Sequence, residues 1–85
     1  MPFEYDEPKD RLNVEKHGIS LSRLSDLIPL KVIDDARREY SEVRYKVFGY
    51  IDGLAYCGAY TLRGENIRAI SLRRAHAKEM RQHGL

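Results

Sequence analysis

The spacing of apolar residues along the chain changes from one period to another near residue 43. Over residues 20–30, leucine and isoleucine recur at the spacing of one helix face. We therefore predict a helix there, capped by Ser20 or Ser22 and ended by Pro29. From residue 43 onward, runs of apolar and aromatic residues predict strands.

A short strand and a helix are predicted at the beginning of the chain. Aromatic and acidic residues alternate over residues 3–6, which is typical of an opening strand at a sheet edge. Residues 8–17 are predicted as a helix because proline suits its first turn and Gly18 can end it in a left-handed conformation. Asp6 or Glu7 can cap its first amides.

The clearest structural signal is the dipeptide Asp52-Gly53, which lies between two strand-like runs at residues 43–51 and 54–62. Asp-Gly favours the positive backbone dihedral angles that a two-residue type I′ turn requires. The sequence therefore predicts a β-hairpin at this place.

Three further elements complete the predicted order. Residues 31–35 contain a β-branched pair that indicates a short strand, and the polar residues 34–42 are predicted as its end and an exposed loop. A turn at residues 63–66 leads into a strand at 67–73, and residues 75–82 are predicted as a short helix. Helices segregated from a largely antiparallel meander define an α+β fold.

The hairpin register, with Ile51 opposite Leu54, sorts the side chains onto two faces of the sheet. The predicted core face carries Phe48, Ala55, Cys57, Ala59, Ile70 and Leu72. The opposite, tyrosine face carries Tyr45, Gly49, Tyr56, Gly58, Tyr60, Ala69, Ser71 and Arg73. Aromatic rings beside glycines and a cation indicate a surface for single-stranded RNA. The alternative is that the tyrosines only pack across strands, as aromatic residues do in many sheets.

Composition narrows the class of protein. A chain of 85 residues is expected to form one domain, residues 1–85, with a modest core. One cysteine excludes an intramolecular disulfide, and the histidines and this cysteine lack zinc-site spacing.

The acidic residues 1–10 do not resemble a signal peptide, and no apolar run reaches the length of a membrane span, so we expect a cytoplasmic protein. The formal charge is −3 over residues 1–42 and +5 over 43–85, which places any polyanion-binding surface in the second half.

The predicted first helix has a distinct polar side. Lys9, Asn13, Lys16 and His17 follow the spacing i, i+4, i+7 and i+8, which gathers them on one side of the helix. A chemical role for this side competes with an ordinary solvated helix, in which His17 only interacts favourably with the helix C-terminus.

Five segments along the chain resemble the BrnT family of bacterial toxins. They are Phe3-Glu4-Tyr5-Asp6-Glu7-Pro8-Lys9, Asn13, Lys16-His17-Gly18-Ile19, Tyr60-Thr61-Leu62-Arg63-Gly64 and Arg68-Ala69-Ile70-Ser71-Leu72-Arg73-Arg74-Ala75. The resemblance implies a RelE-like ribonuclease fold that cleaves RNA without a cofactor. It also implies neutralisation by a ribbon-helix-helix antitoxin similar to BrnA, with toxin dimers in the complex and DNA bound only through the antitoxin.

Cleavage of RNA without a metal requires a proton acceptor such as an imidazole, and cations that stabilise the charged transition state. His17 is the predicted group for proton transfer. The cations predicted to act on the phosphate are Arg63, Arg73, Arg74 and Lys9. The predicted substrate contacts are Lys16, Asn13, Tyr45, Tyr56 and Tyr60. The alternatives are a non-catalytic module that binds RNA or protein, and a purely structural subunit.

Overall fold

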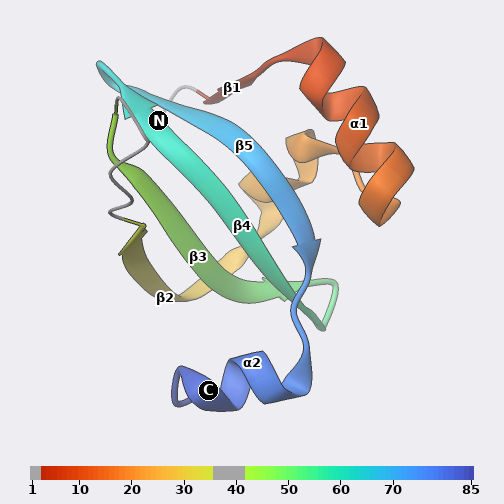
Figure 1. The fold of residues 1–85 in the computed structure, drawn as a ribbon, viewed down its shortest axis with the longest axis vertical. Helices are drawn as coiled ribbons and strands as arrows, with labels where there is room; N and C mark the ends of the chain where they lie inside the picture. The colour runs from red at the N-terminus through yellow and green to blue at the C-terminus, as the bar shows by residue number, and fades with distance from the viewer. Residues whose placement is uncertain (1–2, 36–41) are drawn as a thin grey trace.

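The computed structural model describes residues 3–35 and 42–85 (Figure 1). Its helical elements are α1 (Glu7–His17), the 3₁₀ helix η1 (Leu21–Asp26) and α2 (Ala77–Gln82). Its strands are β1 (Phe3–Tyr5), β2 (Ile28–Asp35), β3 (Arg44–Ile51), β4 (Leu54–Arg63) and β5 (Asn66–Arg74). In these two ranges no helix has the length and apolar character needed to cross a membrane.

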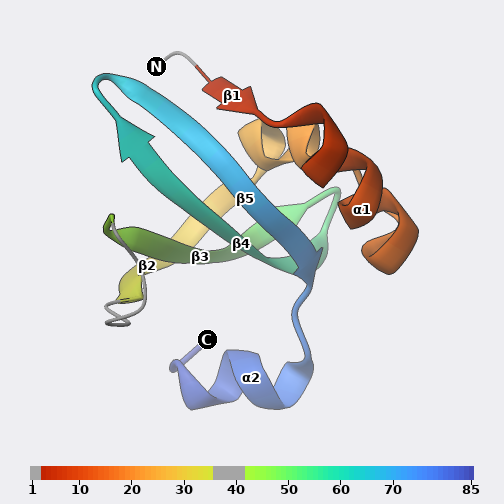
Figure 2. The same ribbon diagram turned by 45° about the horizontal axis from the view of Figure 1, so that its top comes forward.

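Within the described ranges, the strands form one sheet in the order β1-β5-β4-β3-β2. β1 runs parallel to β5 at one edge, whereas the other neighbours are antiparallel. The predicted α+β class, the opening edge strand and the meander are confirmed. Figure 2 shows α1 beside β5, while α2 lies beyond the end of the sheet where β4 begins and β5 ends.

The first helix is confirmed, and its ends form as the sequence predicts. The Asp6 carboxylate accepts a hydrogen bond from the backbone N–H of Lys9 at 3.1 Å, which satisfies one free amide of the first turn. Gly18 ends the helix at φ 70°, a left-handed conformation that costs glycine little. Both α1 and β1 are therefore fixed by local residues.

The helix predicted over residues 20–30 is wrong. Only Leu21–Asp26 is helical, as a 3₁₀ helix capped by Ser20, and the chain becomes extended at Leu27 before β2 begins. Pro29 contributes to the change, because a proline disfavours helical geometry in the residue before it, here Ile28. Pro29 itself lies in an edge strand next to a register shift, where its missing N–H is tolerated.

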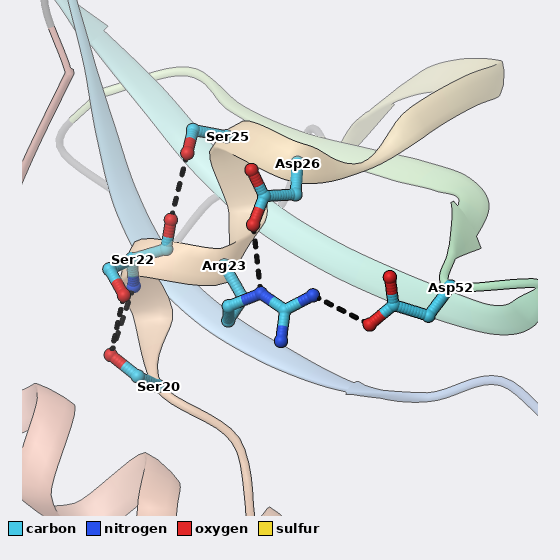
Figure 3. Close-up of polar contacts among 6 residues, drawn as sticks. All are labelled: Ser20, Ser22, Arg23, Ser25, Asp26 and Asp52. Atoms are coloured by element: carbon cyan, nitrogen blue, oxygen red, sulfur yellow. Dashed lines mark hydrogen bonds and ion pairs between the residues drawn. The ribbon is translucent and has the colours of Figure 1, made fainter.

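The short 3₁₀ helix is held by polar contacts on its exposed side. Arg23 donates hydrogen bonds to Asp26 and to Asp52 of the β3–β4 turn, both at 2.8 Å, and the Ser25 hydroxyl donates to the Ser22 carbonyl (Figure 3). Because these groups are exposed, each pair adds little stability. The contacts nevertheless define the position of η1 against the sheet.

The predicted hairpin is confirmed in type and register. Asp52 and Gly53 have φ values of 51° and 77°, as a type I′ turn requires, and Ile51 pairs with Leu54. The second turn also has the predicted register, since the adjoining ends of β4 and β5 pair directly.

A β-bulge in β5 changes the predicted faces. Ala59 pairs with Ser71 and Tyr60 pairs with Ala69, so Ile70 is the extra residue. Beyond the bulge every side chain moves to the other face. Leu72 consequently lies opposite Gly58 on the tyrosine face, while Ser71 and Arg73 lie on the face predicted as core. The predicted faces of these three residues were wrong.

The tyrosine face forms the larger core, so it is not the open RNA surface predicted for it. Its buried cluster contains Leu21 and Leu24 of η1 together with Val47, Ile51, Ala69 and Leu72. Leu24 packs directly on Gly58, where an added Cβ would collide with it. We call this the η1 face.

The opposite side of the sheet, which we call the α2 face, holds a second cluster. Its buried members are Phe48, Cys57, Ala75 and Met80, with Ile33 and Ala55 partly buried against them. The core roles predicted for Phe48, Ala55 and Cys57 are confirmed here. Burial raises the pKa of the Cys57 thiol, although the Arg73 charge opposes this shift, so the thiol stays protonated at neutral pH.

Candidate active site

The helix α1 is attached to the sheet through Asn13. This side chain is 6% exposed, and its amide nitrogen donates to the carbonyls of Ile19 at 2.9 Å and Leu72 at 2.8 Å. Its oxygen accepts the Leu72 N–H at 3.1 Å, so Asn13 pairs with β5 as a neighbouring strand would. Since these contacts occupy the amide, Asn13 supports the site, and the substrate-binding role predicted for it stays a prediction.

A second buried-side contact of α1 holds η1. The Asp10 carboxylate accepts hydrogen bonds from the Ser20 hydroxyl at 2.9 Å and from the Leu21 N–H at 2.7 Å. A carboxylate that accepts such bonds at the start of a helix also interacts favourably with the helix dipole. Asp10 and Asn13 therefore fix α1 from two directions and leave its other side open.

The open side of α1 and the bulged part of β5 enclose a hollow of about 250 Å³, which we call the α1–β5 groove. Its lining residues are Lys9, Leu12, Asn13, Lys16, His17, Ile70 and Ser71. The side chains of Lys9, Lys16 and His17 are exposed. The structure thus brings together the three titratable residues that the helical spacing placed on one side of α1.

The groove has the chemistry of an anion site with a proton carrier. Two ammonium groups and an imidazole border it, its lining contains no carboxylate, and Ser71 is one of the lining residues. Ammonium groups stabilise negative charge on phosphate oxygens, and an imidazole transfers protons near neutral pH.

Arg73 lies next to this groove, with a different set of neighbours. It follows Ser71 by two residues on the same face of β5, and it lines a separate hollow with His76, Lys78, Glu79 and Gln82. Its guanidinium donates to both carboxylate oxygens of Glu79, at 2.8 and 2.7 Å. This bidentate pair holds the guanidinium in one orientation beside the groove.

The Arg73–Glu79 pair makes stability depend on pH. The hydrogen bond from Arg73 lowers the pKa of Glu79 relative to the unfolded chain, so the contribution is present above the unfolded pKa of about 4.3 and is lost as the pH falls through the folded pKa. We expect Glu79→Gln to flatten the acid side of a plot of unfolding free energy against pH, measured by urea titration. Glu15→Gln, on the exposed side of α1, should retain the wild-type slope; equal slopes in all three proteins would contradict the assignment.

The other two predicted arginines lie away from the groove. Arg74 is on the η1 face, with its guanidinium carbon 5.5 Å from the centre of the Tyr56 ring and its Nε donating to the Ala55 carbonyl. Arg63 ends β4 beside Glu42, 3.5 Å away. Arg73 pairs with Cys57, which is six residues from Arg63 along β4, roughly 20 Å at the rise of a β-strand. The expected convergence of His17 with all three arginines is not found.

The predicted tyrosine contacts also lie elsewhere. Tyr45 and Tyr60 stack with ring centres 5.4 Å apart on the η1 face, and burial raises the pKa of Tyr60. Tyr56 packs partly against the η1-face core. Because Ser71 and Arg73 are on the other face, these rings do not border the α1–β5 groove.

The sequence did not predict that Ser71 and Ile70 line the groove. Both belong to the bulge of β5, and a bulge of this kind leaves no local signal in a run of β-formers. The resemblance did contain both residues, inside the segment from Arg68 to Ala75.

Two comparisons with known proteins bear on identity. The comparison with curated proteins gave no match. The family model for the ribonuclease toxin BrnT of type II toxin-antitoxin systems matches residues 5–79, a span that holds α1, the groove and the Arg73–Glu79 pair. Such a match over most of the 85 residues establishes the family: the chain belongs to the BrnT ribonuclease toxins of type II toxin-antitoxin systems.

Proposed function

We propose that this toxin cleaves RNA endonucleolytically in the α1–β5 groove, without a metal ion. The observation that carries the proposal is the gathering of His17, Lys9 and Lys16 around one hollow beside Ser71. Within the ranges 3–35 and 42–85, no three His, Cys, Asp or Glu side chains lie together as a metal-binding group.

The proposed reaction is attack of a ribose 2′-oxygen on the adjacent phosphorus. His17 takes the proton of the 2′-hydroxyl as the new P–O bond forms. The bond from phosphorus to the 5′-oxygen then breaks, and an ammonium group of the groove protonates that oxygen. The products are a 2′,3′-cyclic phosphate and a 5′-hydroxyl. Lys9 and Lys16 stabilise the extra negative charge of the transition state.

Further features follow from the family resemblance. We infer a RelE-like fold, a cytoplasmic location, and inhibition of translation and growth until the antitoxin binds. The proposed antitoxin is a ribbon-helix-helix protein that contacts DNA itself, so the toxin meets DNA only through it. A pair of toxin chains in the complex is part of the same proposal.

The direct test uses purified toxin and an end-labelled RNA oligonucleotide in buffer with excess EDTA. We expect internal cleavage with a 2′,3′-cyclic phosphate on the 5′ fragment. Cleavage only after magnesium or manganese is restored would contradict the metal-free mechanism. Intact RNA that is nevertheless bound, with affinity that falls steeply with salt, would favour the alternative of a non-catalytic binding module.

Arg73 is expected to hold a phosphate next to the scissile one through Nε and the second N–H of Nη2, because Glu79 and the Arg74 carbonyl accept from its other donors. Arg73→Ala should therefore lower kcat/KM for RNA by about 10- to 100-fold, since a charged hydrogen bond contributes about 1.5–3 kcal/mol. Arg63→Ala is the matched control at the distant end of β4, and it should stay within about twofold of wild type. Equal kinetic losses in the two variants would show that Arg73 acts through net charge alone.

A further inference from the structure

A second hollow lies on the η1 face, away from the α1–β5 groove. Its volume is about 360 Å³, and its lining residues are Phe3, Leu24, Ser25, Leu27, Pro29, Val32, Val47, Tyr60 and Ile67. None of these side chains is charged. The η1 helix covers only part of this face, so the apolar floor formed by the strands remains accessible beside it.

The hollow adjoins the β2 edge of the sheet, beyond which the described residues form no further strand. β2 is the outermost strand on this side, eight residues long, and three of its apolar side chains are exposed: Ile28 by 65%, Leu30 by 48% and Val32 by 49%. Long apolar edge strands attract a further strand, and soluble proteins usually block them with charge or cover. Of these three side chains, Val32 lines the hollow, so the apolar surface of the hollow continues to the β2 edge.

The charges around this surface favour protein over RNA. Asp34 is exposed two residues after Val32, on the same side of β2, and it faces Tyr45 across the strand pair. A carboxylate at the rim and the absence of any cation among the lining residues disfavour a polyanion. The same features fit a peptide segment with apolar side chains and a basic residue at one end.

A second copy of the chain fits this edge less well. Two β2 strands paired in parallel would bring Asp34 of each copy together, which is repulsive. Two antiparallel β2 strands centred on Ile33 would place Asp34 of each copy against the apolar Val32 of the other. Lys31 would lie opposite Asp35 of the other copy, but it already donates to the His83 carbonyl. A different partner strand avoids both conflicts.

We propose that the antitoxin of this toxin docks here, adding an extended segment to the Lys31–Asp35 part of β2 and inserting apolar side chains into the hollow. A basic residue of that segment pairs with Asp34. Backbone hydrogen bonds along β2 supply affinity, and the hollow supplies specificity. The proposal uses family membership, and it does not depend on where RNA is cut.

The test measures binding of purified antitoxin, the protein encoded together with this chain, by isothermal titration calorimetry. Val32→Lys places a cation at the hollow and is expected to weaken binding at least tenfold. The matched control is Val14→Lys, which makes the same change at a residue of α1 that is 44% exposed, and it should bind as wild type does. RNA cleavage by the free toxin should be unchanged in Val32→Lys.

Three outcomes overturn the proposal. Equal affinities of the two variants for antitoxin would do so, whether reduced or not. Loss of RNA cleavage in Val32→Lys with antitoxin binding intact would assign the hollow to RNA. If Val32→Lys does not fold, amide hydrogen exchange of the wild-type toxin decides, because antitoxin must slow exchange in Lys31–Asp35, and unchanged exchange there contradicts docking.

Discussion

Replacing His17 by alanine is expected to reduce the rate of RNA cleavage by a factor of about 100 to 10,000, the usual contribution of a positioned acid or base. The side chain is exposed at the last turn of α1, so its removal should leave the fold intact, as judged by circular dichroism. Cleavage is measured with a labelled RNA under single-turnover conditions, so that product release does not mask the chemical step.

The control for this variant is another exposed histidine. His76 precedes α2 and lines the hollow of Arg73, outside the α1–β5 groove. His76→Ala should cleave RNA at close to the wild-type rate. Full activity of His17→Ala, or an equal loss in both variants, would remove the imidazole from the proposed reaction.

Replacing Asn13 by alanine is expected to lower the free energy of unfolding by about 3 kcal/mol. The change leaves the N–H and C=O of Leu72 and the C=O of Ile19 without their partner, and each unsatisfied buried group costs about 1–3 kcal/mol. For a domain of this size the melting temperature should fall by roughly 12–24 °C. Urea titration and thermal melts followed by circular dichroism give both quantities.

Asn66→Ala provides the matched comparison. The Asn66 amide makes one hydrogen bond of 3.4 Å to Glu4, so its loss should cost less than about 1 kcal/mol. If Asn13 instead bound substrate, its alanine variant would keep wild-type stability and lose RNA affinity. That pattern would contradict the supporting role assigned to Asn13.

The parts of the fold that depend on neighbouring residues were predictable from the sequence. The β3–β4 turn needs only the positive φ that Asp52 and Gly53 accept, and the end of α1 needs only Gly18. The polar side of α1 was predictable for the same reason, since helix geometry alone gathers Lys9, Lys16 and His17.

The side-chain positions that depend on the bulge in β5 were not predictable. One extra residue, Ile70, moves Ser71 and Arg73 to the α2 face, and isoleucine fits a regular strand equally well. The helix predicted over residues 20–30 was wrong for another reason. Pro29 favours an extended chain just before it, and Leu24 of η1 packs on Gly58. The tyrosine face is therefore covered by a short helix, whereas the apolar spacing alone predicted a longer one.

The toxin is expected to bind and cut RNA at the α1–β5 groove. The most direct measurement is nuclear magnetic resonance of the isotope-labelled toxin titrated with an RNA that carries a 2′-deoxy sugar at the cleavage position, which binds without reacting. Chemical-shift changes are expected at the amides of Lys9, Lys16, His17 and Ser71. Changes confined to the η1 face, around Val32 and Tyr60, would contradict this expectation.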